Sequence, residues 1–310
     1  MSSLLDRPLR AGILMAADSA MVRRAVTRYG MRFGARRFVA GETTDEFLTV
    51  ARATTAQGFA VAGTVLGESV RDRDEADAVT QEYCAILRAF AREGLDANVA
   101  FKLTHVGLDL DPELAFSNAA RIVAAANESG RTVRMDMEQS RYVDPTLSIY
   151  RRLRERFNNV GFVLQSYLYR SLGDLTAALP MAPNVRIVKG AYLEPANIAY
   201  PHKRDVDENY LKIAEAALSH DGYTAIATHD PKIIDSIAAF AESRGIPKQG
   251  RFEFQLLYGI AAPLARRTLE RGYRVRLSVS FGKNWFPYLM RRLAERPANV
   301  AFFLKGAFSR

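Results

Sequence analysis

Two adjacent arginines beside a tyrosine, near the end of the sequence, form a candidate anion-binding group. They lie in residues 285–296 (WFPYLMRRLAER), whose pattern is helical with Asn284 as the expected N-cap. Two neighbouring guanidinium groups suit a carboxylate or a phosphate. The alternative is a surface helix whose polar face is solvated. At about 100° per residue, the side chains on one narrow face are Tyr288, Arg291, Arg292 and Glu295.

A second set of candidates follows eight short apolar runs that have the length of β-strands. The runs begin at Phe59, Asn98, Thr132, Val160, Val185, Thr224, Phe252 and Arg274. Polar side chains stand at or near the ends of seven runs, among them Lys102, Asp136, Gln165, Lys189, His229, Tyr258 and Ser278. For any single residue, the alternative is a rim lysine or an aspartate that only caps the next helix.

Charged residues inside the runs that begin at Thr132 and Val185 are further candidates. Asp136 alternates with Arg134 and Glu138, so the three side chains share one face of a strand. Arg186 also lies inside a strand, where arginine is unfavourable unless it contacts an anion or an acceptor. Because charges on an interior face must be paired or bind a ligand, these positions indicate a site.

Helical segments between the runs must hold these side chains in position. They cover residues 72–93, 112–127, 145–157, 174–179, 207–219, 231–243 and 263–271, and a further helix follows Asn284. Asp111, Asp144 and Asp230 each precede a proline and are expected to be N-caps.

The alternation of eight strands with helices predicts an α/β fold with parallel pairing, a closed (β/α)8 TIM-like barrel. The competing fold is an open doubly wound sheet, which no GxGxxG or GxxxxGK[ST] motif supports. In a barrel, the polar strand ends share the face on which active sites lie.

The composition limits the chemistry further. With 310 residues and 48% hydrophobic content the chain can bury a large core, and no apolar run approaches the ~20 residues that span a bilayer. The single cysteine excludes a disulfide framework and fits a reducing cytoplasm. The four histidines have no ligand spacing, so no metal is expected. A generic enzyme alternative is an aldolase that forms a Schiff base on Lys102 or Lys189.

A basic segment near the start suggests anionic partners. The formal net charge is +9, and between residues 19 and 41 there are six arginines and no acidic residue. We expect residues 1–42 to form a solvated helical arm and residues 43–310 to form the barrel. The alternatives are an arm that binds nucleic acid or an anionic membrane surface. No nucleic acid is expected, because aromatic residues do not interleave with the arginines in a recognised motif.

Five motifs on separate elements carry a resemblance to a known family. In order they are FVLQSYLYR (162–170), VRIVKGAY (185–192), ATHD (227–230), FEFQLLYG (252–259) and YLMRRLAERP (288–297). From about Gly41 onwards the chain resembles the FAD-dependent proline dehydrogenase family in its compact, monofunctional bacterial form. The resemblance implies a distorted (β/α)8 barrel whose last helix lies over the barrel mouth.

The resemblance also implies a reaction. Members of this family oxidise L-proline to pyrroline-5-carboxylate by hydride transfer to FAD, and a membrane quinone reoxidises the reduced flavin. This is the first step of proline catabolism to glutamate. It implies a cytoplasmic enzyme with at most peripheral contact at the inner face of an anionic membrane.

Residue roles follow from the matching motifs. The resemblance implies a catalytic group of Asp136, Arg186 and Lys102, with Arg186 beside flavin N5 and Asp136 orienting Lys102. It implies a gate formed by Glu68 and Arg291. The substrate-binding residues it implies are Lys102, Tyr192, Leu257, Ser278, Tyr288, Arg291 and Arg292. The cofactor-binding residues it implies are Met137, Gln165, Arg186, Lys189, Gly190, Ala191, Thr228 and His229.

One position departs from the family pattern. Many members have a tyrosine beside the substrate ring where this chain has Ser278. A serine would leave the substrate pocket larger and more polar. We therefore expect this chain to accept hydroxyproline better than tyrosine-bearing relatives do.

Overall fold

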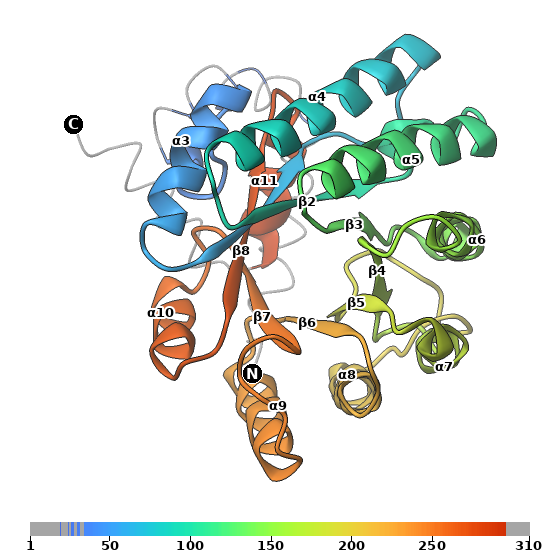
Figure 1. Ribbon diagram of the computed structural model, residues 1–310, viewed down its shortest axis with the longest axis vertical. Coiled ribbons are helices and arrows are strands. Elements are labelled where there is room, and N and C mark those ends of the chain that lie inside the picture. Colours follow the sequence, from blue (N-terminus) through green and yellow to red (C-terminus); the bar gives the residue numbers. More distant parts are fainter. Residues whose placement is uncertain (1–18, 20–23, 25, 28–29, 32–33, 296–310) are drawn as a thin grey trace. The chain divides into compact units, whose positions relative to one another are not determined.

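The structure is a computed structural model that describes residues 34–295, together with residues 19, 24, 26, 27, 30 and 31 (Figure 1). Most of the predicted arm, residues 1–42, lies outside the described residues. The chain divides into two compact units. One comprises Met1–Val50, Val65–Gly67 and Val279–Arg310, and the other comprises Ala51–Thr64 and Glu68–Ser278. The predicted boundary after residue 42 stays a prediction.

Eight parallel strands form a closed barrel in the order of the sequence. They are β1 (Ala60–Val65), β2 (Ala97–Lys102), β3 (Val133–Asp136), β4 (Val160–Gln165), β5 (Asn184–Val188), β6 (Tyr223–Ala227), β7 (Phe252–Leu257) and β8 (Val275–Phe281). Figure 1 shows the strands as a ring with helices α4 to α9 outside it. The predicted (β/α)8 barrel is therefore confirmed. The position of the last helix over the barrel mouth stays a prediction.

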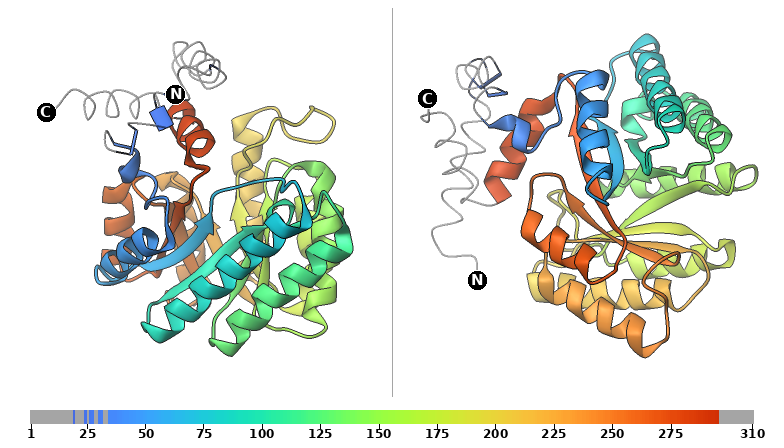
Figure 2. Two further views of the ribbon diagram at one scale, coloured as in Figure 1. Left: turned by 90° about the horizontal axis from the view of Figure 1, so that it is seen from above. Right: turned by 60° about the vertical axis from the view of Figure 1, so that its left-hand side comes forward.

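Helices alternate with the strands along the chain. The described α-helices are α3 (Thr44–Thr55), α4 (Arg73–Arg92), α5 (Pro112–Glu128), α6 (Val143–Arg154), α7 (Ser171–Ala178), α8 (Lys203–Leu218), α9 (Pro231–Ser243), α10 (Ala262–Glu270) and α11 (Trp285–Glu295). Short 3-10 helices are η1 (Ala35–Arg37), η2 (Thr104–Val106), η3 (Ser140–Tyr142) and η4 (Leu179–Met181). Helices α4 and α5 lie side by side (Figure 2). Among the described residues, no helix is long and apolar enough to cross a membrane.

Aspartates begin two helices as predicted. The backbone N–H two residues further on donates to Asp111 at 2.9 Å and to Asp230 at 3.2 Å, and a proline follows each cap. The prediction that Asp144 caps a helix is wrong. Because η3 runs directly into α6, the N-cap is Tyr142, and the Asp144 carboxylate instead forms an ion pair with Arg170.

Helix α3 is not among the predicted helices. A capping box begins it: Thr43 Oγ1 accepts from the Glu46 backbone N–H at 3.3 Å, and the Glu46 carboxylate accepts from the Thr43 N–H at 3.3 Å. The T-x-x-E spacing is the sequence signal for this start. Phe47 in its first turn stacks on Phe281, with ring centroids 4.5 Å apart.

The barrel interior is polar along three alternate strands. Hydrogen bonds join Arg134 of β3 to Asn184 of β5, and Asp136 of β3 to Arg186 of β5. Because both contacts skip the intervening strand β4, they must cross the interior. Side chains in one layer of such a barrel come from alternate strands. Arg134, Asn184 and Glu253 line one cavity and form the layer nearer the amino-terminal strand ends, and Asp136, Arg186 and Gln255 are joined by contacts in the next layer.

Glu253 is the anion of the first of these layers. It is 1% exposed and accepts hydrogen bonds from Arg276 Nε at 2.7 Å, Arg274 Nε at 3.1 Å and the Tyr223 hydroxyl at 3.0 Å. Burial opposes ionisation, but the Arg276 and Arg134 guanidinium groups outweigh it and lower the pKa of Glu253 to about 2. The carboxylate therefore stays ionised across the physiological range.

Replacing this carboxylate tests its contribution to folding. Because the pKa of Glu253 is lower in the folded state than in the unfolded chain, its contribution is present above pH ~4.5 and lost as the pH falls towards 2. We expect Glu253→Gln to lower the free energy of unfolding at pH 7 by about 3–5 kcal/mol, since it leaves buried cations unpaired. The variant should also lose less stability than the wild type between pH 5 and pH 3. Urea unfolding across this range measures both effects.

The exposed carboxylate of Glu208 provides the control, because its side chain is 58% exposed. Glu208→Gln should keep the stability and the acid sensitivity of the wild type. Equal acid sensitivity in wild type and Glu253→Gln would contradict the role given to Glu253.

Candidate active site

The predicted site residues of the barrel unit gather at the carboxyl ends of the strands. Because all strands are parallel, these ends lie on one face of the barrel. Lys102, Asp136, Gln165 and Leu257 are the last residues of β2, β3, β4 and β7. Met137, Lys189 and Thr228 directly follow β3, β5 and β6.

An ion pair between Asp136 and Arg186 lies inside the barrel at this face. The side chain of Asp136 is 18% exposed and that of Arg186 is 10% exposed. Arg186 Nη1 also lies 3.5 Å from Gln255 Oε1. Burial, reinforced by the nearby Arg134 cation, lowers the pKa of Arg186 to about 9, so the group stays protonated at neutral pH.

Lys102 lies opposite Asp136 in the pairing of β2 with β3, yet its ammonium group forms an ion pair with Glu68. Asp136 was expected to orient Lys102, and in the structure its ion-pair partner is Arg186. Glu68 was expected to pair with Arg291 in a gate. That pairing stays a prediction.

Glu138 joins the ends of β2, β3 and β4. Its carboxylate accepts from the Thr104 backbone N–H at 3.2 Å and from the Thr104 hydroxyl at 2.7 Å. Its backbone carbonyl accepts from Gln165 Nε2 at 2.8 Å. Burial raises the pKa of Glu138 despite these hydrogen bonds. The position of Glu138 was predicted, but its partner Thr104 was not.

Lys189 lies in a network of four charged side chains. Its ammonium group is 2.6 Å from Asp207 Oδ1 and 3.1 Å from Asp230 Oδ2. Lys203 also contacts both carboxylates. The Lys189 cation outweighs burial and lowers the pKa of Asp230. Sequence reasoning missed Lys203 and Asp207, and their spacing of four residues in the first turns of α8 is the signal for an ion pair.

Gly190 allows close backbone approach in the loop after β5. Its φ is +110°, and a Cβ at this position would lie 2.2 Å from Tyr167 Cδ1. Only glycine adopts this conformation without strain. The loop continues through Ala191, which is exposed, and Tyr192, which is half-buried.

The ends of β6, β7 and β8 also meet. His229 Nε2 accepts from the Leu257 backbone N–H at 2.9 Å, so a neutral His229 carries its proton on Nδ1. Thr228 Oγ1 accepts from the Asp230 backbone N–H at 3.1 Å. Leu257 lies opposite Ser278 in the strand pairing, and both are half-buried.

The arginine pair lies in α11, which belongs to the other unit. Tyr288 is 8% exposed, Arg292 is half-buried and Arg291 is exposed. The Arg292 guanidinium carbon lies 5.3 Å from the centroid of the Tyr288 ring, within the range of a cation–π contact. The predicted helix is formed, while the Glu295 side chain of its predicted polar face lies outside the described residues. The share of this face in a site with the barrel residues stays a prediction.

Comparison with known proteins identifies the family. The proline dehydrogenase family model matches residues 47–305. The chain belongs to this family. Proline dehydrogenase 1 of Bacillus subtilis subsp. natto is 39% identical over 298 residues, which cover 96% of this chain and 98% of that protein. Proline dehydrogenase of Deinococcus radiodurans is 40% identical over 308 residues, which cover 98% of this chain and 99% of that protein. The resemblance to the monofunctional bacterial form is therefore confirmed.

Solved structures agree with the fold. Proline utilization A (PutA) from Bdellovibrio bacteriovorus, inactivated by N-propargylglycine, is 26% identical with a TM-score of 0.81, covering 89% of this chain and 34% of that one. PutA from Corynebacterium freiburgense is 21% identical with a TM-score of 0.73, and the match covers 99% of this chain and 35% of that one. This likeness supports the fold alone. The chain spans about a third of the length of these PutA chains.

The Asp136–Arg186 pair leads to a test of stability. Asp136→Asn would leave a buried guanidinium group without its carboxylate, which should lower the free energy of unfolding by about 3–5 kcal/mol. The matched control is Asp144→Asn, because the Asp144 side chain is 77% exposed in its pair with Arg170 and should lose about 1 kcal/mol or less. Urea unfolding compares the two variants. Equal losses would contradict a buried ion pair at the barrel mouth.

Proposed function

We propose that this chain is a proline dehydrogenase that oxidises L-proline to pyrroline-5-carboxylate, the first step of proline catabolism to glutamate. The observation that carries the proposal is 39% identity over nearly the whole chain to a protein of that name. The charged side chains at the carboxyl ends of the barrel strands support it, because active sites of this fold lie there.

The substrate is an amino acid with a carboxylate and a cationic nitrogen. Lys102, Arg291 and Arg292 bind the carboxylate, since guanidinium and ammonium groups form charge-assisted hydrogen bonds with it. The ion pair of Lys102 with Glu68 is consistent with this role, because Lys102 already takes a carboxylate there. Glu68 and Arg291 form the gate over bound substrate. The substrate ring is surrounded by Tyr192, Leu257, Ser278 and Tyr288.

The cofactor is FAD. Arg186 Nε is suited to donate a hydrogen bond to an acceptor atom of the flavin ring, because it is buried and has no hydrogen-bond partner among the described residues. The Lys189 ammonium group is suited to a phosphate group. The chemistry that bound FAD supplies is acceptance of a hydride, with reoxidation of the reduced flavin by a membrane quinone. The residues that hold it are Met137, Gln165, Arg186, Lys189, Gly190, Ala191, Thr228 and His229.

The protein contributes mainly by positioning the substrate. A hydride leaves C5 of proline, and the nitrogen lone pair forms the new C5=N bond once the ammonium proton has been lost to solvent. Lys102 and the arginine pair hold the carboxylate and thereby orient that carbon. Asp136 acts through Arg186, which it keeps in place by their ion pair.

The enzyme works in the cytoplasm and reaches its quinone by peripheral contact with the inner face of an anionic membrane. The net charge of +9 supports this contact. No nucleic-acid partner is proposed.

A visible absorption spectrum of the purified protein tests the proposal. We expect flavin bands that bleach when L-proline is added without air, because proline would reduce the bound flavin. Flavin bands that do not bleach would contradict proline as the substrate but would still support FAD as the cofactor. A colourless protein that takes up no added FAD would contradict the assignment as a flavin-dependent oxidoreductase. It would favour an enzyme that forms a Schiff base on a lysine, which borohydride trapping with a carbonyl substrate would detect.

Two arginine variants, one in the proposed substrate site and one control on the surface, extend the spectral test. Arg292→Ala should stay yellow but need much more proline to bleach, because loss of one arm of a charge clamp costs roughly 2–5 kcal/mol of binding. Arg267→Ala, at an exposed position of α10, should bleach as the wild type does. An Arg292→Ala variant that has lost its flavin would contradict the assignment to substrate.

The serine at position 278 leads to a prediction about specificity. We expect Ser278→Tyr to lower turnover of hydroxyproline relative to proline, because the larger ring removes space and a polar group beside the substrate. Steady-state kcat/KM for the two substrates measures the ratio. An unchanged ratio would refute the role of Ser278 in accepting the hydroxyl group.

A further inference from the structure

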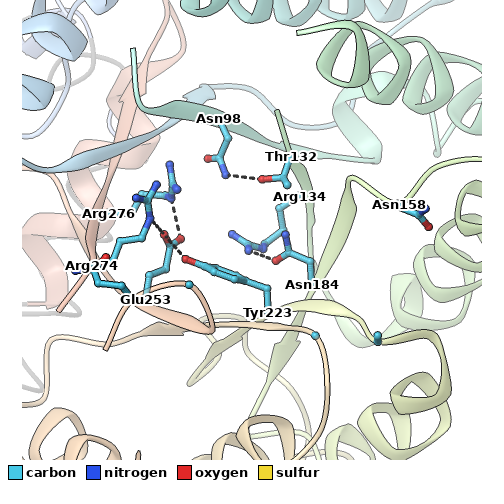
Figure 3. A pocket seen from close by; sticks show the side chains of 13 residues that line it. Asn98, Thr132, Arg134, Asn158, Asn184, Tyr223, Glu253, Arg274 and Arg276 are labelled. Atoms are coloured by element: carbon cyan, nitrogen blue, oxygen red, sulfur yellow. Dashed lines mark hydrogen bonds and ion pairs between the residues drawn. The ribbon is translucent and has the colours of Figure 1, made fainter. Parts of the chain in front are cut away.

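A polar cavity lies at the opposite end of the barrel from the candidate active site. Its volume is about 460 Å³, and its lining includes Asn98, Thr132, Asn184, Tyr223 and Arg274, at the amino-terminal ends of their strands (Figure 3). Exposed Gln249 and Gly250 also line it, so it opens to solvent. None of these residues belongs to the proposed catalytic group.

The charges that line this cavity do not balance. Three guanidinium groups, those of Arg134, Arg274 and Arg276, face a single carboxylate, that of Glu253. Arg274 and Arg276 both donate to Glu253, and Arg274 also donates to Asp96 at 2.6 Å. These two carboxylates therefore balance two of the three cations.

Arg134 is the cation that remains. It is 2% exposed, and no carboxylate of the described residues lies within ion-pair distance of it. Its Nη2 donates to Asn184 Oδ1, while its Nε has no hydrogen-bond partner among the described residues. Burial lowers the pKa of Arg134 to about 10, although the Glu253 carboxylate opposes this shift, and Arg134 stays charged at neutral pH. Glu253 attracts Arg134 without forming an ion pair with it, and a buried guanidinium group with no direct counter-ion is unfavourable unless something else compensates it.

The arrangement of the lining limits where a compensating group can sit. Figure 3 shows Arg134 and Asn184 on one side of the cavity and Glu253 with Arg274 and Arg276 on the other. An anion beside Glu253 would be repelled, whereas one beside Arg134 would meet unused donors of a planar guanidinium group. The volume is larger than a single inorganic anion needs, so a small organic body attached to the anionic group is also accommodated.

We propose that the cavity at the amino-terminal end of the barrel binds a small oxyanion, a carboxylate or a phosphate group, with Arg134 as its counter-ion. The site is separate from the proposed proline site and does not depend on it. Bound anion stabilises the folded barrel, because a ligand that binds only the native state shifts the unfolding equilibrium.

Thermal unfolding of the purified protein in different anions tests the site. Inorganic phosphate and sodium acetate are titrated separately at an ionic strength held constant with sodium chloride. We expect a saturable rise in Tm of about 2–4 °C over chloride alone. A rise in Tm with phosphate alone would show that the cavity selects a phosphate group. A rise with both anions would show that it accepts either kind of oxyanion. If neither anion exceeds chloride, the proposal fails.

Two substitutions assign the effect to Arg134. Arg134→Met should abolish the rise, because the counter-ion is gone. Asn184→Asp should place a permanent carboxylate beside Arg134, so that Tm in chloride increases and phosphate adds nothing further. If Arg134→Met does not fold, the response of Asn184→Asp to phosphate decides whether the anion binds beside Arg134.

A surface arginine provides the control. Arg71→Met removes a cation whose side chain is 87% exposed, and it should keep the full response to phosphate. If Asn184→Asp keeps the wild-type response, the anion binds elsewhere and the proposal is refuted.

Discussion

Charge compensation inside a closed parallel barrel is the constraint on which the rest of this structure depends. Asp136, Arg186, Gln255 and Glu253 form a chain of contacts along the interior, and Arg274 and Arg276 end it at the amino-terminal side. In a medium of low dielectric constant, each charge must meet an opposite charge or enough hydrogen bonds.

The same constraint gives the two ends of the barrel different properties. At the carboxyl ends, Glu68 in the loop after β1 and Asp207 in α8 supply carboxylates to Lys102 and Lys189. At the amino-terminal ends, strand residues and Asp96 supply the carboxylates, and Arg134 is left without one among the described residues.

Family membership and the barrel interior support each other. The match to proline dehydrogenases extends over residues 47–305, which include every strand of the barrel. The ion pair of Asp136 and Arg186 places charges of both signs inside that barrel, at the carboxyl ends of its strands.

The sequence by itself determined the order and type of the elements, because apolar runs with a strand's length alternate with helical periodicity. Predicted strand starts such as Val160 and Phe252 coincide with β4 and β7. It also located the polar strand ends that form the candidate site. Only the tertiary structure decided which charges pair: Asp136 meets Arg186 rather than its strand neighbour Lys102. The physical reason is that barrel closure brings alternate strands together in one interior layer, and linear spacing does not encode that contact.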